Sequence, residues 1–422
     1  MPRALLLALA LLLAAPAGAL ARAGDLDRSF GSSGSVTFQS LGPDVYFTAV
    51  AVQPDGRVVA AADRGNGLTV VRLTRSGAVD RRFGTRGRVQ IKIPGAAARD
   101  IAVFRDGRIL VAGTVAPDAE PSRMVVARLL PAGDLDPNFG EEGVSVVGPE
   151  GSQVDSMALA RDGEVVLGGS LARPDRSSAL VLRLLADGTP DPGFGAGGAV
   201  DSKTVGVPGR ARDVIVLADG SVAAAVAPEL GRVDPSVFVA LRLTPTGAFD
   251  PAFDQDGVVA VSTTELRMSD GGAAGIVPGP GGSLILAGTV RGERGRDDPL
   301  VIRLTAAGLL DPGFGRNGGL RLIASSGRSV HIDALARAHG GRLVLGGHSK
   351  GVAALLRLTP GGRRDTRFGR GGARFVALGR PPGGHRSSSL VTGLAALSDG
   401  RIVTAGAVAG RRSFYPVVAR LR

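Results

Sequence analysis

Four aspartates occupy similar positions near the start of apolar stretches: Asp100, Asp155, Asp213 and Asp333. Carboxylate oxygens are the ligands that Ca²⁺ takes in proteins, and carboxylates also serve hydrolytic enzymes as acid and base. If these stretches converge on one axis, the four side chains could hold a cation or form a hydrolytic site. We favour the simpler interpretation, in which they bond neighbouring backbone groups at strand starts. Asp155 and Asp333 lie one position earlier than Asp100 and Asp213, so we expect the two pairs to point to different faces of their strands.

A second candidate set consists of histidine and tyrosine side chains in or beside polar segments: Tyr46, His331, His348, His385 and Tyr415. Histidine is a common metal ligand, so such a set could form a metal site or a ligand pocket. The spacing matches no known metal motif, and chance among few residues explains the coincidence equally well. We therefore treat these five as binding candidates and assign no metal ligand.

Other chemistry is not indicated by the sequence. The chain contains no cysteine, which excludes thiol catalysis and Cys-ligated metals. No nucleophile motif, zinc motif, phosphate-binding loop or dinucleotide motif stands out. We assign no catalytic residue and expect no cofactor, and enzymatic activity stays an alternative rather than the expectation.

The elements that must position these residues come from a repeat. The pattern Gly-x-x-Asp-x-x-Phe-x-x-x-Gly occurs seven times with all four positions filled, and self-similarity of this kind is the signature of a repeat architecture. The copies are Gly24–Gly34, Gly77–Gly87, Gly133–Gly143, Gly188–Gly198, Gly247–Gly257, Gly308–Gly318 and Gly362–Gly372.

Two further features repeat in phase with this pattern. One is a Gly-bearing turn between apolar strands, Asp55-Gly56 in the first copy, and Asp-Gly in this setting is a strong hairpin signal. The other is an Arg-Leu strand end, Arg72-Leu73 in the first copy. Four strands, named a to d, are predicted per unit, and seven units predict an all-β, seven-bladed β-propeller with four-stranded blades. In the first copy the strands are Thr48–Gln53, Arg57–Ala62, Leu68–Thr74 and Arg88–Ile93.

The ends of the chain predict how the ring closes. A strand at Ser35–Ser40 follows the first repeat turn, and the chain ends on a c strand at Val417–Arg422. The last unit thus lacks a d strand, and the first d strand lacks a unit of its own. We expect the N-terminal strand to become the outer strand of the last blade, which removes the unpaired edges of an open array.

Arginine and aspartate positions support this closure. Six arginines of the Arg-Leu pairs precede an aspartate by eight residues, as Arg72 precedes Asp80. We interpret each as a bidentate ion pair across the c–d turn. Arg420 has no such aspartate, so its partner should be Asp27 at the other end of the chain. The repeated phenylalanines, Phe83 among them, should fill the core between blades.

The repeat unit resembles a known family. The segment from Ala51 to Ala61, followed by Val70-Val71-Arg72-Leu73 and Asp80-x-x-Phe83-Gly84, is similar to the bacterial delta-60 repeat, and the order of strands and turns resembles NHL-type propeller repeats. The resemblance covers essentially the whole mature chain. It implies an exported or surface β-propeller and brings no catalytic motif. Asp254 in place of glycine after Phe253, and Gly281-Gly282 in place of Asp-Gly, depart from the pattern and affect only local turn geometry.

The N-terminal residues are expected to be a targeting segment. A basic start precedes an apolar run at Ala4–Ala15 and two Ala-x-Ala sites, which is typical of a secretory signal peptide. We place the cleavage after Ala23, so that 1–23 are the signal peptide and 24–422 the propeller. The apolar run falls short of the roughly 20 residues of a spanning helix, and no other segment could span. We therefore expect a secreted protein, whether extracellular, periplasmic or at the cell surface.

The formal net charge is +12, and nearly all the cations are arginine. Such a balance could indicate polyanion binding. No run of like charges occurs, and repeated structural arginines together with a GC-rich codon bias explain the excess. We expect no nucleic-acid partner.

Propeller topology divides the loops between two faces. The a–b hairpins and c–d turns carry the repeated motifs and form what we name the repeat face. The b–c and d–a loops differ in length and sequence and form the variable face, where binding is expected. The sequence favours a non-enzymatic, monomeric scaffold that binds a protein or an envelope polymer there. A hydrolase or lyase with an axial carboxylate or metal site, and a purely structural surface protein, are the alternatives.

Overall fold

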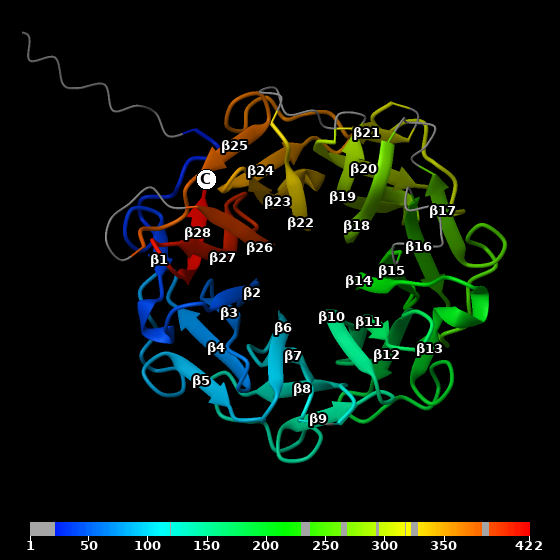
Figure 1. Ribbon diagram of the computed structural model, residues 1–422, viewed down its shortest axis with the longest axis horizontal. Helices are drawn as coiled ribbons and strands as arrows, with labels where there is room; N and C mark the ends of the chain where they lie inside the picture. Colours follow the sequence, from blue (N-terminus) through cyan, green and yellow to red (C-terminus); the bar gives the residue numbers. More distant parts are fainter. Residues whose placement is uncertain are drawn as a thin grey trace, which may run out of the picture.

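Antiparallel strands form seven four-stranded sheets that stand like blades around a central axis (Figure 1). The computed structural model describes residues 22–118, 120–228, 237–262, 268–292, 295–316, 318–321, 328–381 and 388–422. The prediction of a seven-bladed β-propeller is confirmed.

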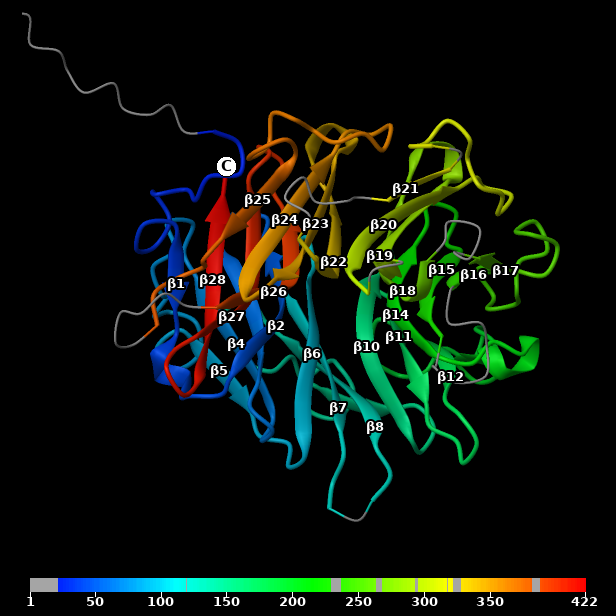
Figure 2. The same ribbon diagram turned by 45° about the horizontal axis from the view of Figure 1, so that its top comes forward.

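The inner strands of the blades surround the axis, and each sheet runs outward from it (Figures 1 and 2). The strands, from the axis outward, are β2 (Tyr46–Val52), β3 (Val58–Asp63), β4 (Leu68–Leu73) and β5 (Arg88–Ile91) in blade 1; β6 (Ala96–Val103), β7 (Ile109–Val115), β8 (Arg123–Leu129) and β9 (Val144–Val147) in blade 2; β10 (Ser152–Leu159), β11 (Val165–Leu171), β12 (Ser178–Leu184) and β13 (Ala199–Asp201) in blade 3; β14 (Arg210–Val216), β15 (Val222–Ala227), β16 (Val237–Leu243) and β17 (Val258–Ser262) in blade 4; β18 (Met268–Pro278), β19 (Leu284–Gly292), β20 (Asp297–Leu304) and β21 (Gly319–Arg321) in blade 5; β22 (His331–Arg337), β23 (Leu343–Ser349), β24 (Val352–Leu358) and β25 (Ala373–Val376) in blade 6; and β26 (Ser389–Ala396), β27 (Ile402–Ala409), β28 (Phe414–Leu421) and β1 (Ser35–Thr37) in blade 7. Within the described residues the strands are accompanied by short 3₁₀ turns at η1 (Gln39–Leu41), η2 (Ser202–Val205), η4 (Pro280–Gly282) and η5 (His339–Gly341).

The core lies between neighbouring blades rather than at the axis. The middle strands are apolar on both faces: in β3, Val58 to Ala62 are all buried, because each sheet packs against a sheet on either side. Phe83 is fully buried in the layer between blades 1 and 2, together with Val59 and Ile101. Continuous apolar runs of Val, Leu and Ala are what two-sided burial requires of a strand.

The repeat turns use left-handed backbone conformations. Gly56 closes the first a–b hairpin at φ 81°, a conformation that glycine adopts without steric penalty. The residue after each repeated phenylalanine also has positive φ, as Gly84 does at 48° and Asp254 at 51°. Asp254 therefore preserves the turn geometry that its departure from the repeat pattern put in question.

An arginine, an aspartate and a phenylalanine meet in every blade. Arg72 Nε lies 2.9 Å from Asp80 Oδ2, and its guanidinium carbon lies 4.4 Å from the centre of the Phe83 ring. Arg128 Nε and Asp136 Oδ2 are joined at 2.8 Å in the same way. Both pairs have a single contact through Nε, because Oδ1 accepts from a backbone N–H and Nη1 bonds the next blade, so the expected bidentate geometry is wrong. The equivalent distances in the other blades are 2.6 Å (Arg183–Asp191), 2.9 Å (Arg242–Asp250), 2.7 Å (Arg303–Asp311), 2.9 Å (Arg357–Asp365) and 2.8 Å (Arg420–Asp27).

The same arginines also connect neighbouring blades. Arg242 Nη1 in blade 4 donates to the carbonyl of Ala306 in blade 5 at 2.7 Å. Arg420 Nη1 in blade 7 donates to the carbonyl of Arg75 in blade 1 at 2.5 Å. Each such arginine therefore neutralises a carboxylate, stacks on an aromatic ring and bonds the next blade, which makes it part of the ring's construction.

The chain termini close the ring as predicted. β1 pairs antiparallel with β28, with Val36 opposite Val418, so the N-terminal strand completes blade 7 (Figure 1). Gly369 N donates to the carbonyl of Ala23 at 2.8 Å. A cleavage after Ala23 would remove that acceptor, whereas a cleavage after Ala21 would retain it.

Breaking the closing ion pair should destabilise the whole propeller. The side chains of Asp27 and Arg420 are 4% and 5% exposed, so Asp27→Ala leaves a buried guanidinium without its counter-charge. We expect the free energy of unfolding in urea to fall by about 3–5 kcal/mol. Asp55→Ala, which breaks the exposed Arg57–Asp55 pair, is the matched control and should cost at most about 1 kcal/mol. Equal effects of the two substitutions would contradict this role.

Candidate functional site

Each inner strand contains a β-bulge near its variable-face end. The register of β2 skips Thr48 and that of β6 skips Arg99. A bulge opposes two residues to one on the partner strand and changes where the following side chains point. One skipped residue from each blade joins a ring around the axis: Thr48, Arg99, Asp155, Arg212, Ala274, Asp333 and Thr392. β18 has a second register shift nearer its start, between Ser269 and Gly271.

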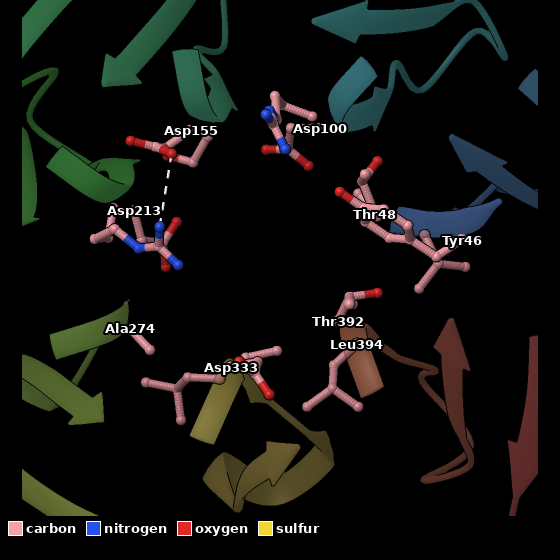
Figure 3. Close-up of a pocket in the computed structure, with 17 residues that line it drawn as sticks. Tyr46, Thr48, Asp100, Asp155, Asp213, Ala274, Asp333, Thr392 and Leu394 are labelled. Carbon is pink, nitrogen blue, oxygen red and sulfur yellow. Dashed lines mark ion pairs between the residues drawn. The ribbon is translucent and has the colours of Figure 1, made fainter. Parts of the chain in front are cut away.

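The residues that follow the bulges join this ring at the mouth of the axial channel (Figure 3). The mouth encloses about 320 Å³, and its lining includes Asp100, Asp155, Asp213 and Asp333. The expectation that the two pairs of aspartates point to different faces is therefore wrong. Asp155 and Asp333 are the skipped residues, Asp100 and Asp213 follow theirs, and the bulge directs both positions toward the channel.

Asp100 and Asp213 bond the backbone of the next blade. Asp100 Oδ2 accepts from Met157 N at 2.7 Å, and Asp213 Oδ2 accepts from Ile276 N at 2.8 Å. Burial raises the pKa of Asp100 to about 6. Burial, with a smaller contribution from the charge of Asp100, raises the pKa of Asp213 to about 7. These carboxyls are partly exposed to the channel but lie deep in the molecule, and they link inner strands to one another.

Asp155 is held by arginine. Its two oxygens accept from Arg210 Nε at 2.9 Å and from Arg210 Nη2 at 2.7 Å. Arg212 Nη1 lies 3.7 Å from Asp155 Oδ1 (Figure 3). A carboxylate in a bidentate pair is a poor candidate for a general base, because one lone pair on each oxygen already accepts from the guanidinium group.

Asp333 lies between two histidines. His348 Nδ1 is 3.1 Å from Asp333 Oδ2, and His331 Nε2 is 3.6 Å from Asp333 Oδ1. The two imidazole rings are 5.1 Å apart. The hydrogen bond with Asp333 raises the pKa of His348 above its usual value, and burial offsets this only in part. The result is a hydrogen-bonded His–Asp pair on the side of the mouth opposite Asp100.

Tyr46 lies at the mouth on blade 1, across blade 7 from Asp333 (Figure 3). Its hydroxyl donates to Asp63 Oδ2 at 3.4 Å, and its ring lies 6.2 Å from that of Phe414. A second cavity of about 510 Å³ opens here, lined by residues of blades 6, 7 and 1 that include Tyr46, Asp333, His348 and Phe414. It shares Tyr46, Asp333 and Thr392 with the channel mouth.

Of the five His and Tyr candidates, three come together with Asp333: Tyr46, His331 and His348. Tyr415 is partly buried against the apolar layer that contains Leu378 and Val417, and it does not line the cavity. His385 lies outside the described residues. In the part of the chain that the structure describes, no three His, Asp or Glu side chains are close enough together to hold a metal ion.

The complete ring was not predicted from the sequence. Arg99, Arg212 and Thr392 lie at the mouth but were not singled out. A signal was present: each residue of the ring precedes the turn glycine by eight positions, as Thr48 precedes Gly56. Aligning the copies on that glycine would have identified all seven. Phe414 and Leu390, which line the second cavity, have no such fixed spacing to a repeated residue.

Comparison with known proteins agrees with the fold. Residues 53–83, 105–139, 160–194 and 280–314 match the family described as a domain of unknown function (DUF5122) beta-propeller. Each segment starts near an a–b turn and ends at a repeated phenylalanine, so the likeness concerns the repeat face and its strands. The chain is thus a β-propeller repeat protein. No curated protein matches it.

Two solved structures have similar architecture. One is a catalytically inactive virginiamycin B lyase from Staphylococcus aureus with quinupristin, at 11% identity and a TM-score of 0.53, covering 91% of this chain and 98% of the lyase. The other is the polysaccharide lyase Uly1, at 12% identity and a TM-score of 0.50, covering 89% of this chain and 90% of that chain. At such identity the likeness shows the fold alone. No helix among the described residues is long and apolar enough to cross a membrane.

The channel carboxyls predict an unusual dependence of stability on pH. The pKa values of Asp100 and Asp213 in the folded protein lie above the ordinary 3.8, so the folded state binds their protons more tightly than the unfolded state. Their contribution is complete below about pH 4 and is lost as the pH rises through about 6 to 7. We expect the melting temperature to fall between about pH 5 and about pH 8.

The double substitution Asp100→Asn and Asp213→Asn should flatten this decline, because neither side chain can then ionise. His348 contributes to the decline in the same direction, since its pKa is also raised, so part of the slope should persist. Asp134→Asn, at an exposed position on the repeat face, is the control and should leave the slope unchanged. An unaltered slope in the double variant would contradict the assignment.

Proposed function

We propose that the protein is an exported, non-enzymatic scaffold of the delta-60 repeat type, which binds a protein or a cell-envelope polymer through its variable face. The proposal unites the resemblance of the repeats, the expected signal peptide and the geometry of the channel mouth. One observation carries it: three of the four channel carboxyls, Asp100, Asp155 and Asp213, bond groups of neighbouring blades, while the mouth beside them stays open.

The occupied carboxyls weigh against catalysis. Asp100 and Asp213 accept backbone N–H groups from neighbouring blades, and Asp155 is paired with Arg210. A general base must reach a substrate proton with a free lone pair at hydrogen-bond distance. A hydrolase or lyase built on these residues would depend on groups that already bond neighbouring blades, which makes this alternative weaker.

The open mouth weighs against a purely structural role. The start of β2 pairs with the end of β3, with Tyr46 opposite Asp63, and Asp63 in turn pairs with Leu68 across the b–c loop. The mouth, the b–c loops and the d–a loops therefore share the variable face. Exposed charged side chains stand on these loops, among them Arg176 in blade 3 and Arg411 in blade 7. A concave mouth surrounded by such loops is a typical position for a binding site.

A binding assay with two matched variants tests the proposal. The purified protein is mixed with the cell-envelope fraction of the producing organism, and bound protein is measured after sedimentation. Arg176→Glu with Arg411→Glu changes the variable face, and Arg81→Glu with Arg161→Glu makes the same charge change on the repeat face. We expect the first pair to weaken binding by about tenfold or more, which is about 1.4 kcal/mol, and the second to have little effect.

Protease treatment of the fraction separates the two partner classes, since only a protein partner is lost. The proposed role of the variable face would be contradicted if the two double variants lost affinity equally. It would also be contradicted if the unmodified protein showed no saturable binding to the untreated or the protease-treated envelope fraction. Retention of binding in both variants would contradict it too.

A further inference from the structure

We propose that the second cavity, the one of about 510 Å³ between blades 6, 7 and 1, binds a small organic amine. The ammonium group would lie at Asp333 and the apolar part of the ligand along Leu390 and Phe414. The inference goes beyond the partner proposed above and stands independently of it, because it depends only on the side chains of the cavity.

The wall is a continuous apolar strip on blade 7. Leu390 pairs with Ala407, and Ala409 pairs with Phe414, so these four side chains lie on one face of the sheet. Leu390 is 37% exposed, which makes it one of the few large exposed hydrophobic residues among those described. The cavity volume of about 510 Å³ lies within the range of roughly 300–1,000 Å³ typical of small-molecule sites.

The polar end presents acceptors. Asp333 Oδ2 is engaged by His348, but Oδ1 lies 3.6 Å from His331 Nε2, beyond hydrogen-bond distance, and can accept from a ligand. The Tyr46 hydroxyl donates to Asp63, so only its oxygen and its ring remain available. Among the described residues that line the cavity, none is lysine or arginine. An ammonium donor satisfies these groups, and the Tyr46 and Phe414 rings offer faces that attract a cation.

The charges around Asp333 make binding depend on pH. The groups that face it are His331 on the same strand and His348 on β23. The negative charge of Asp297, on β20 of blade 5, contributes to raising the pKa of His348. Tyr46 on β2 lies on the remaining side and donates its hydroxyl to Asp63. Protonated histidines compete with an ammonium group for the carboxylate. Amine affinity should therefore rise with pH as His348 loses its proton, and binding should release protons.

Three probes of one shape test the ligand class: phenethylamine, 2-phenylethanol and 3-phenylpropionate, titrated into the full protein by calorimetry. We expect the amine to bind most tightly and the carboxylate most weakly, because an anion would meet Asp333. The amine should bind more tightly at about pH 8 than at about pH 6, with proton release seen as a dependence of the heat on the buffer.

Variants locate the site. Asp333→Asn should lower amine affinity by about tenfold or more, about 1.4 kcal/mol, and should change binding of the alcohol little. Leu390→Ser, at a position that is 37% exposed, should weaken binding of both ligands together. His339→Gln lies on the repeat face and serves as the control. Melting temperatures of all variants show whether each has folded.

Three results would overturn the inference. They are an equal affinity for amine, alcohol and carboxylate, the absence of saturable amine binding, and an unchanged amine affinity in a folded Asp333→Asn variant. If Asp333→Asn fails to fold, Leu390→Ser and the pH dependence decide the matter, since an unaffected amine affinity in Leu390→Ser would place the ligand elsewhere.

Discussion

The buried ion pair between an arginine of strand c and the aspartate of the following turn is the interaction on which the propeller depends. In each blade the guanidinium stacks on the repeated phenylalanine, and in most it also donates to a carbonyl of the next blade. A charge buried in this way is stable only while all its partners are in place. Blade spacing and ring closure are thereby set by one unit, and Asp27 and Arg420 form it from opposite ends of the chain.

Because that unit lies at the outer and repeat-face side of the blades, the variable-face ends of the inner strands are free to differ. The bulge in each inner strand directs the skipped residue, and in most blades the residue after it, to the channel mouth without disturbing the layers between blades. Blades 2 to 4 supply Arg99, Asp155 and Arg212 there, and blade 6 supplies Asp333 with its two histidines. A nearly symmetric scaffold thus carries an asymmetric distribution of charge.

This asymmetry separates two kinds of polar group at the mouth. Asp100 and Asp213 are tied to backbone amides of neighbouring blades, so their perturbed pKa values reflect their burial in the structure rather than readiness for chemistry. Asp333 keeps an oxygen without a close donor and adjoins an apolar cavity. Perturbed carboxyls are common at functional sites, but here geometry distinguishes the structural ones from the one that is open to a ligand.

The sequence by itself determined the number of blades, the four strands of each blade, the closure by the N-terminal strand and the partners of the buried arginines, since all these depend on local patterns that repeat in phase. Observed strands differ from the expected ones by only a few residues at their ends, as β28 does at Phe414–Leu421. The tertiary structure alone decided which residues face the channel, because a bulge alters side-chain direction where simple alternation predicts otherwise. It also decided that Tyr46 and Phe414, from opposite ends of the chain, stand beside His348 and Asp333. That proximity arises from ring closure and sheet packing, which act between segments that no sequence spacing relates.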